Sequence, residues 1–370
     1  MDFSIGRGGS ELVIDCSSSD LKLAVGNYNP KSGNIQIDTI GIVPLETDAI
    51  NDGAIADSFG IVMAVKHAIA RLGIRNKSCI ITTEGAFVHT RDLELPVAKE
   101  EQLKDMVKYE VIGQGTNRDL SIDYIVYGTT KDEETNADKL KVRATAIPTD
   151  TIKDYREFLK EMELQPTALD MNPNCVRKLF SRGIINGNVN ITQSTLLLIE
   201  LASRTTTVTV LDKGFPVLSR RLQFGHSNIR QVADSVKKLQ GTNQQSSLAR
   251  RLSITTTDAA ASVPIEDIDV WNETVANTPA LQSAVNAYFK SLVDAVSRTA
   301  QFSISKYHID AISTCFLYGS GAGYKKIDKE LSRQLGTQVE ILKSLSTVNG
   351  PKNFELHQFV NCCGALIRND

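Results

Sequence analysis

Apolar runs bounded by turn residues occur along the whole chain, and one arrangement of them occurs twice. Residues 12–25, LVIDCSSSDLKLAV, contain an apolar strand, a carboxylate at its end, a small polar turn and an alternating second strand. Residues 197–210, LLIELASRTTTVTV, have the same order. Alternation of apolar and polar positions is typical of a strand with one buried face. The two segments therefore predict an internal repeat, whose alignment pairs Asp15 with Glu200, Ser17 with Ala202, Ser18 with Ser203 and Lys22 with Thr207.

Each copy of the repeat continues in the same way. A turn follows the second strand, and we expect a third strand that ends at a glycine, Gly41 in the first copy and Gly225 in the second. Helical patterns come next: 57–72 has apolar residues on one face and ends before Gly73, and 279–306 has an apolar stripe along its length. Three antiparallel strands followed by helices, repeated once, predict a duplicated α/β protein with a cleft between its halves.

An insertion separates the two copies. Its pattern predicts an amphipathic helix at 97–113, strands at 120–130 and 137–148, and a second helix at 150–164. This βαββα-like order is small enough to form a subdomain of its own. A polar region at 237–278 interrupts the second copy, and we expect it to form a helical subdomain with exposed loops.

The composition narrows the class of protein. The 370 residues carry a formal net charge of −2 and 41% are hydrophobic, which is ordinary for a globular protein and gives no electrostatic reason to expect nucleic acid. The six cysteines include no CxxC pair and predict reduced, buried thiols, and the five histidines show no ligand spacing. No apolar run approaches the ~20 residues that span a bilayer. We therefore expect a cytosolic protein that reaches a membrane only through a partner.

The turns of the repeat carry groups that can bind phosphate. Backbone N–H groups and hydroxyls meet phosphate oxygens, a lysine adds positive charge, and two acids, here Asp15 and Glu200, hold Mg²⁺ through water. A third element, CFLYGSGAGYKKI at 315–327, runs from a buried strand into glycines that let a ligand approach the backbone. Each element alone also fits an ordinary hairpin, a glycine turn or a solvated lysine, but their order favours a nucleotide cleft. The candidates are Asp15, Ser17, Ser18, Ser19, Lys22, Glu200, Ser203, Thr205, Thr206, Gly319, Ser320 and Gly321.

Longer motifs carry a resemblance to a known family. The insertion contains LELPVAKEEQLKDMVKYEVIGQG and LSIDYIVYG, PTALDMNP follows it, and FGHSNI and LYGSGAG lie in the second half. In this order, and over nearly the whole chain, they are similar to motifs of the PilM family of type IV pilus assembly proteins. That family belongs to the actin-like ATPase superfamily and is related to FtsA. The resemblance implies a duplicated actin-like (RNase H-like) α/β fold of two lobes with an FtsA/PilM-type inserted subdomain.

The resemblance also implies how the chain divides. The expected parts are a first core subdomain from 1–88 plus 165–190, the inserted subdomain at 89–164, a second core subdomain from 191–225 plus 308–370, and a helical subdomain over the nucleotide cleft at 226–307.

The function that the resemblance implies is pilus assembly. PilM proteins bind ATP in the cleft and dock the short cytosolic N-terminal tail of the inner-membrane protein PilN in a groove beside the insertion, which links the membrane platform to pilus assembly ATPases. For this chain it implies ATP and Mg²⁺ as cofactors, a PilN-type tail as partner, and a cytoplasmic position at the inner face of the cell membrane without direct insertion. The groove is expected near PTALDMNP, with Asp170 and Asn172 as candidates. The further nucleotide-binding candidates are Ala202, Gly225, His226 and Arg298.

The chain departs from the family pattern where phosphate would bind. Ser17 and Ala202 replace hairpin glycines, Glu200 replaces an aspartate, His226 replaces the second glycine of a pair, and Ser320 replaces a glycine of the adenosine turn. Each added Cβ narrows the approach to phosphate, and costs about 1 kcal/mol or more where the glycine had positive φ. Ser17 could instead donate its hydroxyl, and Glu200 could reach a metal one methylene further out. We expect weak or absent ATP binding and at most a weak ATPase, with catalytic residues unassigned because no side chain has a visible claim to orient water.

Two other functions compete with the adaptor. An FtsA-like, membrane-associated cytoskeletal ATPase carries a C-terminal amphipathic helix, whereas this chain ends in FVNCCGALIRND, which resembles the end of the actin-like core. We therefore expect an adaptor held by a partner. A metabolic kinase would need a sugar-binding acid in the cleft and is the least favoured of the three.

Overall fold

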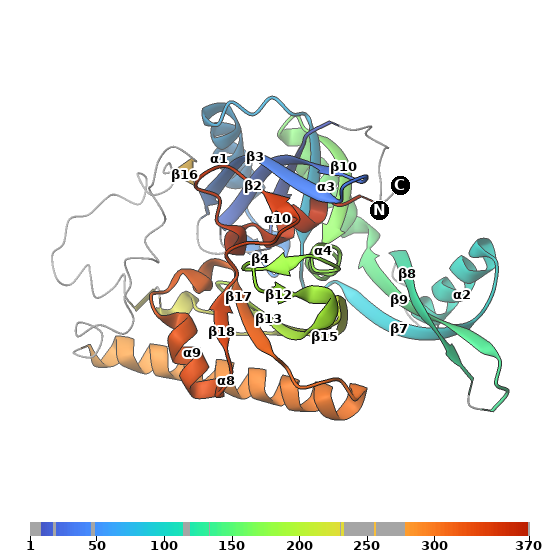
Figure 1. The fold of residues 1–370 in the computed structure, drawn as a ribbon. Coiled ribbons are helices and arrows are strands. Elements are labelled where there is room, and N and C mark those ends of the chain that lie inside the picture. The colour runs from blue at the N-terminus through green and yellow to red at the C-terminus, as the bar shows by residue number, and fades with distance from the viewer. Residues whose placement is uncertain are drawn as a thin grey trace.

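Two lobes, one above the other in Figure 1, and a smaller subdomain that projects from one side make up the molecule. Ser18, Ser19 and most of the helical subdomain expected at 237–278 lie outside the residues that the structure describes. The computed structural model describes residues 9–17, 20–45, 49–113, 119–132, 134–229, 231–232, 255–256 and 278–368.

The first lobe is built on a mixed sheet that begins with the predicted meander. Strands β1 (Glu11–Asp15), β2 (Asp20–Asn29) and β3 (Asn34–Pro44) pair antiparallel in chain order. On the other side of β1, β6 (Ser78–Thr83) and β10 (Gln165–Met171) continue the sheet in parallel. Every residue of β1 and β6 after the first is buried, as expected for parallel neighbours that are covered on both faces. The resulting order is β10-β6-β1-β2-β3.

The second lobe repeats this topology. Strands β13 (Thr195–Leu201), β14 (Thr206–Asp212) and β15 (Phe215–Leu222) form an antiparallel meander, and β17 (Thr314–Tyr318) and β18 (Val339–Ile341) follow in parallel. The order β15-β14-β13-β17-β18 is that of the first lobe, strand for strand. The predicted duplication is therefore confirmed.

The predicted ends of the two third strands are wrong. Strand β3 runs through Gly41 to Pro44 because β2 stays paired with it as far as Asp20. Strand β15 ends at Leu222, before Gly225 is reached. In both lobes the partner strand, not the glycine, decides where the strand stops.

Helices cover the outer faces of the two sheets. Helix α1 (Ser58–Arg71) starts where the Asp57 side chain accepts a hydrogen bond from the amide of Gly60, and it buries its predicted apolar face on the first sheet. Helix α3 (Thr149–Glu161) packs into the same core, although its sequence position groups it with the insertion. In the second lobe, α8 (Pro279–Tyr307) runs along the outer face, as predicted for 279–306, and α9 (Ile327–Leu335) lies beside it (Figure 1).

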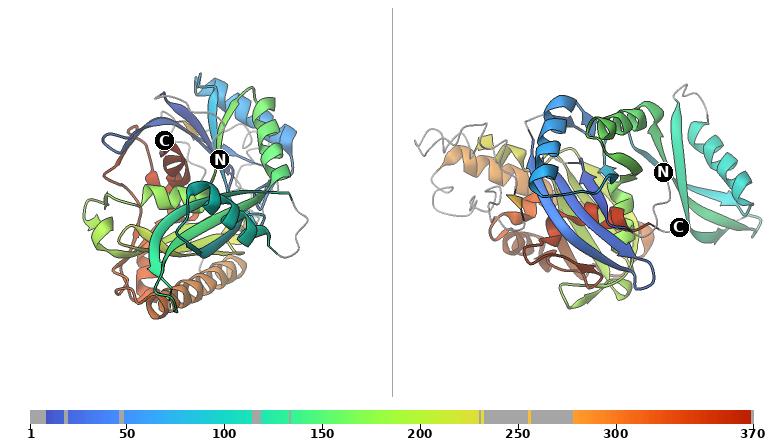
Figure 2. Two further views of the ribbon diagram at one scale, coloured as in Figure 1. Left: turned by 90° about the vertical axis from the view of Figure 1, so that its right-hand side faces the viewer. Right: turned by 90° about the horizontal axis from the view of Figure 1, so that it is seen from above.

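The inserted subdomain projects away from both lobes, as the side and top views show (Figure 2). It consists of β7 (His89–Pro96), α2 (Glu100–Ile112), β8 (Leu120–Lys131) and β9 (Asp138–Pro148), which agree with the predicted elements. The sheet order is β7-β9-β8, and α2 packs on one face. A small core of its own holds the helix to the sheet; it contains Leu95, Leu103, Val107, Val142 and Ala144.

The second lobe touches the opposite face of this small sheet. The rings of Tyr127 in β8 and Phe215 in β15 stack with centroids 5.1 Å apart. The Arg143 guanidinium lies 5.4 Å from the centre of the Tyr127 ring, and Arg143 donates to the carbonyl of Pro216 at 3.4 Å. Two hydrogen bonds from Arg143 to Asp92, of 2.7 and 3.1 Å, hold the guanidinium in place. The start of β15 therefore packs against the sheet of the insertion.

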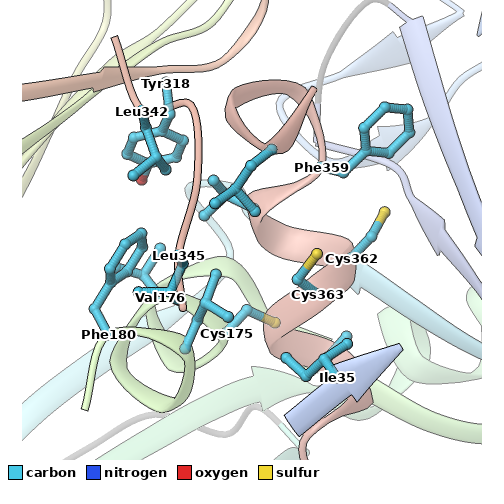
Figure 3. Close-up of a cluster of buried hydrophobic side chains, with 14 of the residues drawn as sticks. Ile35, Cys175, Val176, Phe180, Tyr318, Leu342, Leu345, Phe359, Cys362 and Cys363 are labelled. Atoms are coloured by element: carbon cyan, nitrogen blue, oxygen red, sulfur yellow. The ribbon is translucent and has the colours of Figure 1, made fainter. Parts of the chain in front are cut away.

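Two helices lie between the sheets and join the lobes through one hydrophobic core. Helices α4 (Asn172–Leu179) and α10 (Val360–Leu366) pack side by side, and every residue of α10 is buried. They come so close that a Cβ on Gly364 would lie 2.2 Å from the carbonyl oxygen of Cys175. Figure 3 shows this core, in which Cys362 and Cys363 of α10 lie among side chains of both lobes. One hydrophobic core therefore runs from the first lobe through α4 and α10 into the second lobe.

Short elements complete the described residues. None of the helices within the described ranges is both long and apolar enough to cross a membrane. The short strands are β4 (Ile50–Asn51), β5 (Ala54–Ile55), β11 (Ile184–Ile185), β12 (Val189–Asn190), β16 (Thr255–Thr256) and β19 (Val348–Asn349), and the 3-10 helices are η1 (Ile191–Gln193), η2 (Ser320–Gly323) and η3 (Leu356–Gln358).

Candidate functional site

The two repeated hairpins face each other between the lobes, and their acids lie at matching positions. Asp15 is in register with Lys22 across β1 and β2, and Glu200 is in register with Thr207 across β13 and β14. The sequence alignment had placed these two pairs on each other, and the structure confirms it. All four side chains are buried. The cavity between them has a volume of about 10 Å³ and is lined by Asp15, Ser17, Lys22, Glu200, Ala202, Tyr318, Gly319, Ser320, His357, Gln358, Val360 and Asn361.

A side chain from the C-terminal helix α10 bridges the two acids. Asn361 Nδ2 donates to Asp15 Oδ2 at 3.1 Å and to Glu200 Oε1 at 3.3 Å. Asn361 is only 4% exposed. One amide group therefore contacts the carboxylates of both lobes.

The groups of the first hairpin form hydrogen bonds within the hairpin. The amide and the hydroxyl of Ser17 both donate to Asp15 Oδ1, at 3.0 and 2.5 Å. Lys22 Nζ donates to the carbonyl of Asp20 at 3.1 Å. The hydroxyl that replaces a glycine thus binds the neighbouring acid.

The second hairpin is closed by the segment that follows its third strand. The amide of His226 donates to the carbonyl of Ala202 at 3.4 Å, and the amide of Ser227 donates to that of Ser203 at 2.8 Å. A Cβ on Gly225 would lie 2.3 Å from the Ser203 oxygen, so this contact requires glycine. The chain therefore lies directly against the turn.

The His226 ring connects this hairpin to the glycine-rich turn. Its Nε2 lies 3.0 Å from the Ser320 hydroxyl, and its Nδ1 lies 3.1 Å from the Tyr324 hydroxyl. The ring is buried, and a Cβ on Gly321 would lie 2.8 Å from its Cδ2. The second hairpin and the predicted adenosine turn are thus in contact through a side chain.

Burial and the proximity of other acids raise the pKa of two carboxyl groups. Desolvation, and then the nearby charge of Asp15, raise the pKa of Glu200 to about 7. Glu84, which follows β6, is also buried, and desolvation together with the charge of Glu200 raises its pKa to about 8. The site therefore disfavours a full set of ionised carboxylates at neutral pH.

An arginine of the second lobe crosses to the first lobe near these acids. Arg221 in β15 has its Nη2 2.5 Å from Asp52 Oδ1 and its Nε 3.9 Å from Glu84 Oε1. Close by, Arg204 Nη1 donates to Asn51 Oδ1 at 3.1 Å. These polar contacts join the two lobes in addition to the hydrophobic core around α4 and α10.

The structure brings together only part of the predicted set. Arg298 is exposed on α8 and is not among the residues that line this cavity, so its role in nucleotide binding stays a prediction. The Thr206 hydroxyl donates to the carbonyl of Phe224 at 2.9 Å and has a structural role. The other predicted residues that are described but lie behind the lining are Ser203, Thr205, Gly225, His226 and Gly321.

The two candidates for the partner groove are buried. Asp170 is 5% and Asn172 is 2% exposed, so neither side chain is open to a peptide at the surface. Asp170 instead accepts a hydrogen bond from Lys178 Nζ at 2.6 Å, and Lys178 also donates to the carbonyl of Ile367 at 2.7 Å. Burial is the largest single influence and opposes ionisation, but the Lys178 charge and the hydrogen bonds from Lys178, Asn174 and the Met171 amide together outweigh it and lower the pKa of Asp170. This ion pair joins β10, α4 and the C-terminal segment.

Several residues of the site were not predicted, among them Asn361, Glu84 and Arg221. Asn361 is a polar residue in the apolar run FVNCCGAL, and that exception was the available signal. Glu84 is an acid directly after a buried strand, as Asp15 is. Arg221 gave no signal, because its role depends on how the two lobes meet.

The described residues leave little space for Mg²⁺ and ATP in this arrangement. A cavity of about 10 Å³ has room for about one water molecule. Among the residues that the structure describes, no group of three or more His, Cys, Asp or Glu side chains is placed to hold a metal ion.

Comparisons with known proteins give the family and the fold. The family model described as type IV pilus assembly protein PilM matches residues 13–250. A solved PilM-PilN type IV pilus biogenesis complex aligns with a TM-score of 0.70 at 16% identity, over 96% of this chain and 97% of that chain. Two others are the ethanolamine utilization protein EutJ from Carboxydothermus hydrogenoformans (TM-score 0.49, 12% identity, 98% and 91% covered) and MreB 5 of Spiroplasma citri bound to AMPPNP (0.46, 11%, 97% and 95%). The two-lobed fold is actin-like.

Proposed function

This chain belongs to the PilM family of type IV pilus assembly proteins, and from that premise we propose that it is an assembly adaptor that binds the cytosolic N-terminal tail of a PilN-type inner-membrane protein. The observation that carries the proposal is the similarity, over 96% of this chain, to a protein solved as a PilM-PilN complex. In this role the protein lies at the cytoplasmic face of the inner membrane and is held there by its partner. Pilus assembly ATPases are further proposed partners.

The proposed docking region lies beside the inserted subdomain. Three large apolar side chains of this subdomain are exposed: Val97 by 61%, Tyr109 by 76% and Val126 by 47%. Exposed aromatic and aliphatic side chains favour peptide contacts, since their burial supplies binding energy. Because Asp170 and Asn172 are buried, we propose that they support the structure of the groove and do not contact the tail directly.

We further infer that nucleotide binds weakly or not at all and that turnover is negligible. Three observations support this inference: the Asn361 bridge between the acids, the small volume of the cavity, and the His226 ring against the glycine-rich turn. Catalysis by an ATPase also needs a residue that orients the attacking water. No described side chain in the cavity lining is assigned that role.

Fluorescence anisotropy with a labelled synthetic peptide tests the adaptor role. The peptide is the cytosolic tail of the PilN-type protein from the same genome, and its scrambled sequence is the control. We expect saturable binding of the native peptide alone, with the same Kd in EDTA and in Mg²⁺ with ATP. A folded sample that binds neither peptide, with or without nucleotide, would contradict the proposal.

A further inference from the structure

The bridge at Asn361 is a polar contact inside an otherwise apolar helix. The other residues of α10 are valine, cysteine, glycine, alanine and leucine, and all are buried in the core that the lobes share. The Asn361 side chain points out of this core to Asp15 on one side and Glu200 on the other. The bridge connects positions that are 346 and 161 residues distant in sequence. It is therefore a tertiary contact between the two lobes.

The chemistry of the amide matches two facing carboxylates. A side-chain amide nitrogen carries two hydrogens, and here each one is directed to a different acid. When both acids are ionised, the opposite orientation of the amide would place its oxygen against two acceptors, so the nitrogen faces the acids in that state. Two acids held this close repel each other unless a cation, a proton or a hydrogen-bond donor lies between them.

Other charged groups surround the pair but leave the bridging position to Asn361. Lys22, in register with Asp15, lies on the first-lobe side and lowers the cost of ionising Glu200. On the far side, burial and the charge of Glu200 raise the pKa of Glu84, and Arg221, 3.9 Å away, opposes this shift. The cavity of about 10 Å³ has room for about one water molecule beside these groups.

We propose that the Asn361 amide takes the place of a bridging cation between Asp15 and Glu200, so that protein side chains alone hold the two lobes at the closed spacing. The inference deepens the proposed nucleotide-independent role and rests on it. An adaptor with this bridge presents one arrangement of lobes and insertion, whatever the nucleotide concentration.

Replacement of the amide by a carboxylate tests the bridge. Asn361→Asp has nearly the same shape but places a third acid between the two, so we expect the melting temperature in EDTA to fall by roughly 5 °C or more. Millimolar Mg²⁺, or micromolar Tb³⁺, should restore most of that loss and leave the wild-type melting temperature unchanged. Asn174→Asp is the matched control: it also faces a buried acid, Asp170, but Lys178 is already present, so no cation response is expected. A wild-type protein stabilised as much as the variant, or an Asn361→Asp protein that neither cation stabilises, would overturn the inference.

A double-mutant cycle keeps the test decisive if that variant does not fold. Asn361→Ala should lower the melting temperature of the wild-type protein at pH 8, and by less than half as much in a Glu200→Gln background, where the acid that it bridges is neutral. Equal losses in the two backgrounds would overturn the bridge. Peptide binding is measured separately, so an intact bridge in a protein that captures no tail would refute the adaptor role alone.

Discussion

Glu84 of the first lobe lies 3.9 Å from Arg221 of the second lobe, measured from Oε1 to Nε, and yet its pKa is raised to about 8. Burial is the largest cause and the charge of Glu200 the next, and together they outweigh the arginine. The folded protein therefore keeps a proton on Glu84 that the unfolded chain loses near pH 4.5. Its contribution to stability is complete below that pH and is lost as the pH rises through 8.

We accordingly predict that the free energy of unfolding falls between pH 6 and pH 8. A carboxyl that holds a proton in the folded state but not in the unfolded state lowers the free energy of unfolding by about 1.4 kcal/mol for each unit that the pH rises. This applies to Glu200 up to about pH 7 and to Glu84 up to about pH 8. Urea denaturation at half-unit pH steps measures the slope. Glu84→Gln should flatten it between pH 7 and pH 8, and an unchanged slope in this variant would contradict the assignment.

Removal of Lys178 should leave a buried charge without its partner. Lys178 and Asp170 are 8% and 5% exposed, so Lys178→Met should cost about 3–5 kcal/mol, as for other broken buried pairs. The exposed pair of Lys153 and Asp150 is the matched control, and Lys153→Met should cost less than about 0.5 kcal/mol. Urea denaturation at pH 7 measures both.

A second substitution separates loss of the partner from loss of packing. Asp170→Asn combined with Lys178→Met removes both charges, and we expect it to recover at least half of the loss. Equal losses for the single and the double variant would mean that the lysine stem, and not its charge, stabilises this region.

The affinity for nucleotide should be low. Isothermal titration of the wild-type protein with Mg²⁺ and ATP should show a Kd weaker than about 1 mM, because the acids are bridged and the cavity is small. Lys22→Ala should leave this result unchanged. Tight binding that disappears in Lys22→Ala would show instead that the hairpins open and accept phosphate.

Substitutions on the insertion should weaken capture of the tail. Tyr109→Ala and Val126→Ser each remove an exposed apolar side chain, and we expect each to raise the peptide Kd by about tenfold, or about 1.4 kcal/mol. Phe59→Ala removes an aromatic ring that is 77% exposed on α1, and because this helix lies on the side of the first lobe away from the insertion (Figure 1), the substitution should have no effect. Equal weakening by all three would place the tail elsewhere, or show a general loss of structure.

The fold was predictable because strand patterns are local. The repeat aligned Asp15 with Glu200 and Lys22 with Thr207, and the same pairs occupy the same register in the two sheets. Helix α8 was predictable for the same reason, because its apolar stripe repeats with the period of a helix.

The interior of the site was predictable only in part, because its contacts are tertiary. Asn361 meets the two acids only after α10 has inserted between the lobes. His226 was a candidate only as the replacement of a glycine in the FGHSNI motif, and nothing local indicates that its ring reaches Ser320 and Tyr324 in the glycine-rich turn. Arg298 is exposed on α8, and the sequence pattern of a long helix does not decide whether such a charge faces the cleft.

One strand, β15, touches both regions on which the proposals depend. Phe215 at its start stacks on the insertion, and Arg221 near its end reaches the first lobe beside the acids. A strand that moves as one rigid element transmits displacement, so a shift of Phe215 also shifts Arg221. A spectroscopic label at either end of β15 would therefore report on events at the other, and peptide capture could be followed from inside the cleft.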